Sequence, residues 1–308
     1  MELFLKLFCT CTLFVLLSSC NSPVGPSGMN YHNKILFASS RSGIEQLYMM
    51  NPDGTDIQQL TTGPYWHAWG RWSPDTKRIV AMTGENSSTA CPSEIVVFDV
   101  DGTNQRLLSC GAHVAWSPDG KKIAFSYMPR GEIGDLTTHI YVMDVDGTNP
   151  LQLTGNLGDI DDTPGWSPDG TTIAFSSSRD YPTGSLYTEI YVMHADGSDQ
   201  RRLTFINSLM NGDPSWSPDG EKIAFESNGG IAIIDKDGTN FCRITDEYKI
   251  GFGGYGQPRW SPDGKRLVMI WYPADWSART FIFTVNIDGS GLSKLLEDST
   301  ANSPDWSE

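Results

Sequence analysis

The five residues Trp116-Ser117-Pro118-Asp119-Gly120 decide the fold, because their first two recur at a regular spacing along the chain. Six regularly spaced Trp-Ser pairs stand at residues 72–73, 116–117, 166–167, 216–217, 260–261 and 306–307. They are 44 to 50 residues apart, a period typical of propellers and solenoids. Pro-Asp follows the first five pairs, and then Gly or, at position 76, Thr. Proline presets the backbone of a first turn position and Asp-Gly completes a tight reversal, so each copy predicts a turn between two strands.

Further strands are predicted in every unit. The run Lys122-Ile123-Ala124-Phe125-Ser126 after the turn alternates in the way that a strand does. The run Ile140-Tyr141-Val142-Met143 comes next, and an Asp-Gly pair follows it. The aspartates of these pairs stand at positions 53, 101, 146, 196, 237 and 288. Because Asp-Gly favours hairpin turns with positive φ, a last short strand, such as the one ending at Leu153-Thr154, closes the unit.

Four antiparallel strands, A to D, in roughly 45 residues have the size of one propeller blade. The first unit, Lys34 to Thr61, has strands B to D but no Trp-Ser before it, whereas Trp306-Ser307 has nothing after it. Pairing these two ends gives six complete blades and leaves no exposed sheet edge. We therefore predict an all-β fold: a monomeric six-bladed β-propeller over residues 34–308, with its C-terminal strand paired to blade one.

The Trp-Ser-Pro-Asp-Gly and Asp-Gly pattern resembles the TolB-type β-propeller repeat, which also occurs in dipeptidyl-peptidase and oligopeptidase propellers. The resemblance covers residues 34–308 and implies the propeller fold rather than one function, because this scaffold carries many functions. TolB itself has an α/β domain ahead of its propeller and no lipid anchor, whereas only a short segment precedes blade one here. The peptidases add a hydrolase domain with a Gly-x-Ser-x-Gly motif, and this chain has neither the length nor the motif.

The N-terminus predicts export. Residues 1–19 have the pattern of a signal peptide, in which Lys6 precedes an apolar run. The stretch Leu17-Ser18-Ser19-Cys20 resembles the bacterial lipobox, which implies cleavage before Cys20 and acylation of its thiol. Residues 20–33 contain several Gly and Pro residues, so we expect a flexible tether. We predict a lipid-anchored envelope protein at the outer membrane, facing the periplasm or the cell surface; an ordinary secretory signal with a chance cysteine is the alternative.

The charge excludes one class of partner. The 308 residues include 37 acidic and 22 basic ones, a formal charge of −15, without a cluster of Lys and Arg. Such a surface repels DNA and RNA and has no basic stripe to release their counterions. We therefore expect no nucleic-acid partner. Acidity of this kind commonly serves solubility, and a specific cationic ligand is the alternative.

The two faces of the predicted ring differ. The A–B turns and the C–D hairpins share one face, the turn face, and are short and alike. The B–C and D–A loops share the other, the loop face, and vary in length and sequence. Because binding residues tend to lie on loops held by a rigid scaffold, we predict that ligands bind the loop face.

Aromatic and arginine side chains mark this predicted binding surface. The candidate residues are Trp66, His67, Trp69, His113, Tyr127, Arg130, Tyr181, Asp213, Tyr255 and Trp276. Side chains of these types are typical of protein–protein contacts, and the aromatic ones can stack on sugars. Packing between blades is the alternative role for each aromatic residue.

No repeated metal-ligand chemistry is found. The residue three before each Trp-Ser pair should lie near the mouth of a central channel, and these residues are Trp69, His113, Thr163, Asp213, Gln257 and Ser303. We expect no cofactor. Asp159, Asp161 and Asp162 on one D–A loop are weak candidates for Ca²⁺, which takes oxygen ligands. A solvated acidic loop is the alternative.

Three cysteines follow Cys20. Cys91 and Cys110 flank the C–D hairpin of blade two at similar distances from its turn, so their strands could bring them together as a disulfide. The sequence leaves open whether the bond forms. We expect Cys242, beside Phe241 and Ile244, to be a buried thiol.

These features favour a non-catalytic scaffold that binds an envelope protein, a peptide or a glycan. The first alternative is a propeller enzyme, a polysaccharide lyase or hydrolase, in which His67 or His113 works with Asp161 or Asp213. The histidines show no paired motif that would support it. The second alternative is a component of a Tol-like envelope complex, which rests on analogy alone.

Overall fold

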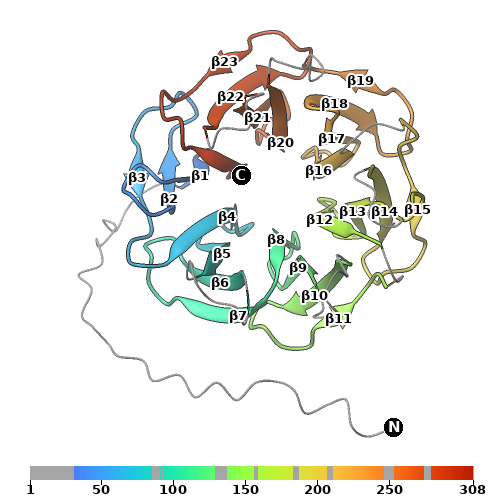
Figure 1. Ribbon diagram of the computed structural model, residues 1–308, viewed down its shortest axis with the longest axis horizontal. Helices are drawn as coiled ribbons and strands as arrows, with labels where there is room; N and C mark the ends of the chain where they lie inside the picture. The colour runs from blue at the N-terminus through green and yellow to red at the C-terminus, as the bar shows by residue number, and fades with distance from the viewer. Residues whose placement is uncertain are drawn as a thin grey trace, which may run out of the picture.

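The computed structural model describes residues 31–84, 91, 93–128, 137–155, 159–182, 187–206, 211–245, 253–273 and 279–307. Six four-stranded antiparallel sheets stand around a central axis in this part of the chain (Figure 1). Strand A of each sheet lies nearest the axis, and strands B, C and D follow outward. The predicted six-bladed propeller is confirmed. No helix in these residue ranges is long and apolar enough to cross a membrane.

The strands of blades one to three follow this order from the axis outward. Blade one consists of β24 (Asn302–Trp306), β1 (Ile35–Ser39), β2 (Gln46–Met50) and β3 (Gln58–Gln59). Blade two consists of β4 (Trp66–Trp72), β5 (Arg78–Gly84), β6 (Glu94–Asp99) and β7 (Arg106–Cys110). Blade three consists of β8 (Ala112–Trp116), β9 (Lys122–Tyr127), β10 (His139–Asp144) and β11 (Leu151–Gln152).

Blades four to six repeat the arrangement. Blade four consists of β12 (Asp161–Trp166), β13 (Thr172–Ser177), β14 (Glu189–His194) and β15 (Arg201–Arg202). Blade five consists of β16 (Asn211–Trp216), β17 (Lys222–Ser227), β18 (Gly230–Asp235) and β19 (Cys242–Arg243). Blade six consists of β20 (Gly254–Trp260), β21 (Arg266–Tyr272), β22 (Phe281–Asn286) and β23 (Ser293–Lys294).

Apolar side chains between adjacent blades form the core. One cluster joins Val80 of β5 to Phe125 of β9, and five further clusters do the same around the ring. Hydrogen bonds add to this packing near the turn face. The indole Nε1 of Trp116 donates to the carbonyl of Arg71 in the preceding blade at 3.1 Å, and Trp216 and Trp260 make the equivalent bonds. Apolar packing and these hydrogen bonds therefore hold each blade against its neighbours.

The turns form as their residue types dictate. In the A–B turn of blade three, Ser117 Oγ donates to Asp119 at 2.7 Å and accepts from the Lys122 N–H at 2.9 Å. In the C–D hairpins the Asp carboxylate accepts from the residue two positions later; Asp146, for example, accepts from the Thr148 N–H at 3.0 Å. These bonds lower the pKa of Asp119 and of Asp146 below the ordinary value of an aspartate. The aspartates are turn residues, as predicted.

Blade one is completed by both ends of the chain. Strand β24 pairs with β1 in antiparallel register, Trp306 opposite Ile35, as predicted from the repeat. Ser307 Oγ accepts from the Lys34 N–H at 2.7 Å, as Ser117 does in blade three, but donates to the Tyr31 carbonyl, also at 2.7 Å. A backbone oxygen thus replaces the Asp carboxylate of the other turns. Residues of the N-terminal segment supply the A–B turn that blade one lacks in sequence.

Candidate functional site

A ring of six equivalent residues surrounds the axis near the loop face. Strand A of every blade is bulged at the third residue before its Trp. These residues are Trp69, His113, Thr163, Asp213, Gln257 and Ser303, with φ between 48° and 54°. An L-residue in this left-handed region costs about 1–2 kcal/mol. Bulges of this kind redirect side chains, and six in register give the propeller a ring of side chains near the axis.

The residues of this mouth ring contact one another between blades. The Trp69 and His113 rings meet edge to face, with 4.6 Å between centroids. Thr163 Oγ1 accepts from the Asp213 N–H at 3.2 Å. Gln257 Oε1 accepts from the Ser303 N–H at 3.1 Å. These contacts join the six residues in three pairs, each pair spanning two neighbouring blades.

A cavity of about 510 Å³ lies beside the mouth ring, between blades one and two. The B–C loop of blade one provides Ile44 and Glu45, and β4 provides Trp66 and Trp69, with Met82 of β5 behind them. Pockets of 300–1,000 Å³ with aromatic walls and a few polar groups are typical of ligand sites. We call it the loop-face cavity.

The carboxylate of Glu45 is the charged group of this cavity, and a hydrogen bond holds it in place. Asn302 Nδ2 donates to Glu45 Oε1 at 2.7 Å. The second oxygen of Glu45 has no hydrogen-bond partner among the described residues. A carboxylate beside two indoles suits a cationic group with an apolar stem, because indole faces also attract cations.

An exposed aromatic patch lies on the same face, over blade four. Phe205 is 72% exposed, and Tyr187 is 40% exposed. Tyr181 packs against Tyr187 with tilted rings and 5.5 Å between their centroids, and the Arg202 guanidinium lies 4.7 Å from the Phe205 centroid. Glu189 accepts from Arg202 at 2.6 Å and fixes its position. A preorganised aromatic and arginine group of this kind is typical of protein contact sites.

His113 has a carboxylate partner that the sequence did not indicate. Its Nδ1 lies 2.6 Å from Asp162 Oδ1 of the next blade. Burial lowers the pKa of His113, but Asp162 outweighs that effect and raises it, with a smaller contribution from Asp213. The raised pKa favours an imidazolium paired with the Asp162 carboxylate. The structure thus brings His113 together with Asp162, rather than with Asp161 or directly with Asp213.

Three of the predicted binding residues are buried or half-buried. His67 is only 3% exposed, and burial lowers its pKa to about 4, so it is neutral at pH 7. Tyr127 packs on the core between blades two and three, and Tyr255 packs edge to face on Phe283 at 5.8 Å. These side chains are placed to support the loop face. Arg130 and Trp276, which were also predicted as binding residues, lie outside the described residues.

The three aspartates considered for Ca²⁺ do not converge. Asp161 is fully buried and pairs with Arg179 at 2.9 Å, whereas Asp162 pairs with His113. Asp159 uses its backbone carbonyl to accept from the Thr138 N–H. Within the described ranges, no group of three His, Cys, Asp or Glu side chains is placed to hold a metal ion.

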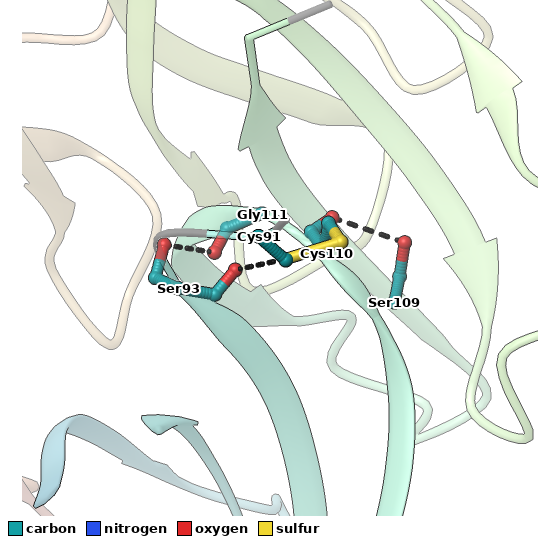
Figure 2. The surroundings of a disulfide bond; sticks show 5 residues. All are labelled: Cys91, Ser93, Ser109, Cys110 and Gly111. Atoms are coloured by element: carbon teal, nitrogen blue, oxygen red, sulfur yellow. Dashed lines mark hydrogen bonds between the residues drawn. A yellow bond between two sulfur atoms is a disulfide. The ribbon is translucent and has the colours of Figure 1, made fainter. Parts of the chain in front are cut away.

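Cys91 and Cys110 form a disulfide in the structure (Figure 2). Their Cα atoms are 5.9 Å apart, a normal separation for this bond. Beside it, Ser93 Oγ donates to the Gly111 carbonyl at 2.8 Å. The bond ties the B–C side of blade two to the end of its outer strand. The expectation for Cys242 is wrong: this thiol is exposed, because the two-residue strand β19 forms the outer rim of blade five.

The sequence did not single out Glu45, Met82 or Asp162 as members of this site. Glu45 and Met82 lie on different blades from one another, and only the closed ring places them at one cavity. Asp162 was considered for metal binding only, because its partner His113 is 49 residues away in sequence. The shared position four residues before the Trp, which places Asp162 beside the mouth ring, was the available signal.

Comparison with known proteins identifies the propeller. Residues 110–308, more than half of the chain, match the family model described as the TolB beta propeller domain. The structure is similar to TolB from Acinetobacter baumannii, with 22% identity, a TM-score of 0.70 and coverage of 91% of this chain and 67% of that one. No curated protein matches the chain in sequence.

Two further solved structures are similar. A protein assigned as TolB from Agrobacterium tumefaciens has 24% identity and a TM-score of 0.65, over 87% of this chain and 90% of that one. A chain of the nidogen/laminin complex has 11% identity and a TM-score of 0.66, over 89% and 98%. At such identities the likeness to these structures shows the fold alone.

Proposed function

Because the chain belongs to the TolB beta propeller domain family, we propose that it is a non-catalytic scaffold that holds a protein or peptide on its loop face. The family and the Cys91–Cys110 disulfide are typical of an envelope protein. One observation carries the choice of face: the loop-face cavity lies beside the mouth ring, and both present aromatic side chains that their neighbours hold in place.

The chemistry of the cavity indicates the kind of residue that it takes. Trp66, Trp69 and Met82 supply apolar surface, and Glu45 supplies a negative charge. A lysine or arginine of the partner fits both, because its stem is apolar and its head is cationic. The formal charge of −15 would also speed association with a basic partner.

A photo-crosslinking amino acid at position 44 tests the proposal in cells. We expect a crosslink from position 44 to a partner protein and none from position 57. Ile57 is a suitable control because it is 40% exposed on the C–D hairpin of the same blade, on the turn face. Equal crosslinking from both positions would contradict the assignment to the loop face.

A charge substitution is the second test of the loop-face proposal. We expect Ile44→Lys to reduce capture of that partner about tenfold or more, because it places a cation beside Glu45 where the partner's cation should lie. Ile57→Lys should leave capture unchanged. If binding sensitive to Ile44→Lys is found for soluble envelope glycans instead, the ligand is a sugar that stacks on the indoles.

We also propose that Cys20 is acylated and anchors the propeller to the membrane. The support is the Leu-Ser-Ser-Cys sequence at 17–20; residues 1–30 lie outside the described part of the chain. Labelling of cells with a palmitate analogue should mark the wild-type protein and leave Cys20→Ala unmarked. Equal labelling of both would exclude the anchor at this position.

A catalytic use of the mouth ring is the second candidate, and the His113–Asp162 pair favours it. A carboxylate that orients an imidazole is a recurring arrangement in acid–base catalysis. Activity on a panel of uronate polymers that disappears in His113→Ala would support an enzyme. No turnover by the wild-type protein, with and without divalent metals, would support the scaffold.

A further inference from the structure

A second cavity lies on the axis at the opposite end of the molecule. Its volume is about 540 Å³, and all six tryptophans of the Trp-Ser pairs line it. The prolines of five A–B turns complete the wall, so the cavity belongs to the turn face. We call it the turn-face cavity. It shares no residue with the loop-face cavity.

The residue before each Trp gives this cavity two unlike halves. Three neighbouring A strands, β8, β12 and β16, present small residues: Ala115, Gly165 and Ser215. The other three, β20, β24 and β4, present Arg259, Asp305 and Arg71. Figure 1 shows that each set of strands is contiguous around the axis. One half of the cavity therefore has space for a ligand, and the other half has charged side chains.

The two guanidiniums are preorganised. Arg71 Nη1 donates to the carbonyl of its neighbour Gly70 at 3.0 Å, and Arg259 Nη1 donates to that of Pro258 at 2.7 Å. Arg71 is only 8% exposed. Both guanidiniums therefore have fixed positions in the cavity wall, and each keeps further N–H groups that can donate to a ligand.

Their charge is only partly compensated. Asp305 is the one carboxylate of the described residues within 4.0 Å of either guanidinium, with its Oδ1 at 3.9 Å from Arg259 Nε. Its Oδ2 accepts from the Trp72 N–H at 2.8 Å. Among the residues that line the cavity, two cations and one anion leave a net positive charge in a protein whose total is −15. Burial and repulsion by Arg259 lower the pKa of Arg71 to about 9, although Asp305 and Asp213 act in the opposite direction. An added anion would raise this pKa again.

We propose that the turn-face cavity binds a small ligand with a carboxylate and an aromatic or apolar body, whose carboxylate lies between Arg71 and Arg259. The arginine fork matches the two oxygens of a carboxylate. The space over Ala115, Gly165 and Ser215 receives the body of the ligand, which contacts the tryptophans. The site is separate from the proposed loop-face site.

Calorimetry on the full chain tests this site, with benzoate, benzamide and inorganic phosphate as probes. We expect one benzoate per chain and no binding of the neutral benzamide. Arg71→Gln and Arg259→Gln should each weaken benzoate at least tenfold. Arg201→Gln is the matched control, because Arg201 is exposed on the outer strand β15. Ile44→Lys should leave benzoate binding unchanged, because Ile44 lies at the other cavity. The benzoate result is therefore independent of the loop-face proposal.

Asp305→Asn separates a ligand site from a structural ion network. Asparagine can still accept from the Trp72 N–H, while the removed charge should tighten benzoate several-fold. Because this variant predicts a gain, misfolding cannot imitate the expected result. The proposal is wrong if benzamide binds as well as benzoate, or if Arg71→Gln and Arg259→Gln fold and bind benzoate normally. Binding of phosphate without benzoate would also overturn it, because an apolar body would then contribute nothing.

Discussion

Glu226 is a carboxylic acid in a place that disfavours its ionised form. Its Oε1 accepts from the Tyr272 hydroxyl at 2.9 Å in the neighbouring blade. A Cβ added at Gly256 would lie 2.5 Å from its Oε2, which shows how closely the blade six backbone approaches. Burial, with a contribution from Asp213, raises the pKa of Glu226 to about 8. The side chain is therefore mostly protonated at pH 7.

This pKa predicts a stability effect with a definite sign. Between pH 4.5 and about 8 the folded state holds a proton that the unfolded state has lost, so the contribution of Glu226 falls as the pH rises through this window. Glu226→Gln removes the titration and can keep the bond from Tyr272. We expect the variant to match the wild type at pH 4.5 and to exceed it by roughly 1–3 kcal/mol at pH 9.

Urea unfolding at pH 4.5, 7 and 9 measures the difference. Glu221→Gln in the same blade is the control, because Glu221 is exposed and pairs only with the exposed Lys236. Its effect should be small at every pH. A difference between Glu226→Gln and the wild type that does not change with pH would contradict the raised pKa.

The disulfide acts at the scale of a single blade. Blade two has the longest strand D, β7, with five residues where the other blades have two. Its register shifts between Ile95 and Val96, so pairing with β6 is irregular near Cys110. The Cys91–Cys110 bond holds this end of the strand. It closes a segment of 19 residues, which in a chain-entropy estimate contributes on the order of 3 kcal/mol.

Replacement of both cysteines by serine should therefore lower the free energy of unfolding by about 2–4 kcal/mol. Reduction of the wild-type protein should give the same loss, and reduction of the double variant should change nothing further. Cys242→Ser is the control, because this thiol is free and exposed. Equal stability of the oxidised wild type and the double variant would contradict the role of the bond.

The sequence predicted the elements better than the contacts between them. The A–B turns and C–D hairpins follow from Pro, Asp and Gly at fixed offsets, and these preferences are local. The bulges were not predicted, because Trp69, Thr163 and Gln257 have no preference for positive φ; the ring geometry imposes it. The six positions themselves could be read from the repeat, since equivalent residues take equivalent places.

The candidate sites needed the closed ring. The His113–Asp162 pair and both cavities join residues of different blades, and no local pattern encodes these contacts. The residue before each Trp was nevertheless a visible column in the repeat. It reads Arg, Ala, Gly, Ser, Arg and Asp, which already separates a charged half from a small half.

At the scale of the whole molecule, the ring depends on a single non-covalent closure. Strand β24 supplies the inner strand of blade one, and Trp306 packs into the core shared with blade six. Deletion of residues 302–308 should cost at least about 3 kcal/mol, because it removes a buried Trp and a whole strand. For a chain of this size that corresponds to a fall in Tm of at least about 5 °C. A truncated protein that melts with the full chain would refute this closure.

A circular permutant tests whether β24 stabilises the ring by its pairing in blade one or by its covalent link to blade six. The chain would begin at Asn302, run from Ser307 directly into Tyr31, and end at Ala301. The junction is short, because Ser307 Oγ already donates to the Tyr31 carbonyl at 2.7 Å and the Ser307 N–H donates to Lys34 at 2.9 Å. Blade one would then be continuous like the other five. The Tm of the permutant should match or exceed that of the full chain, because a covalent turn removes the entropy cost of bringing the two ends of the ring together. A Tm as low as that of the truncated protein would show that β24 needs its link to blade six.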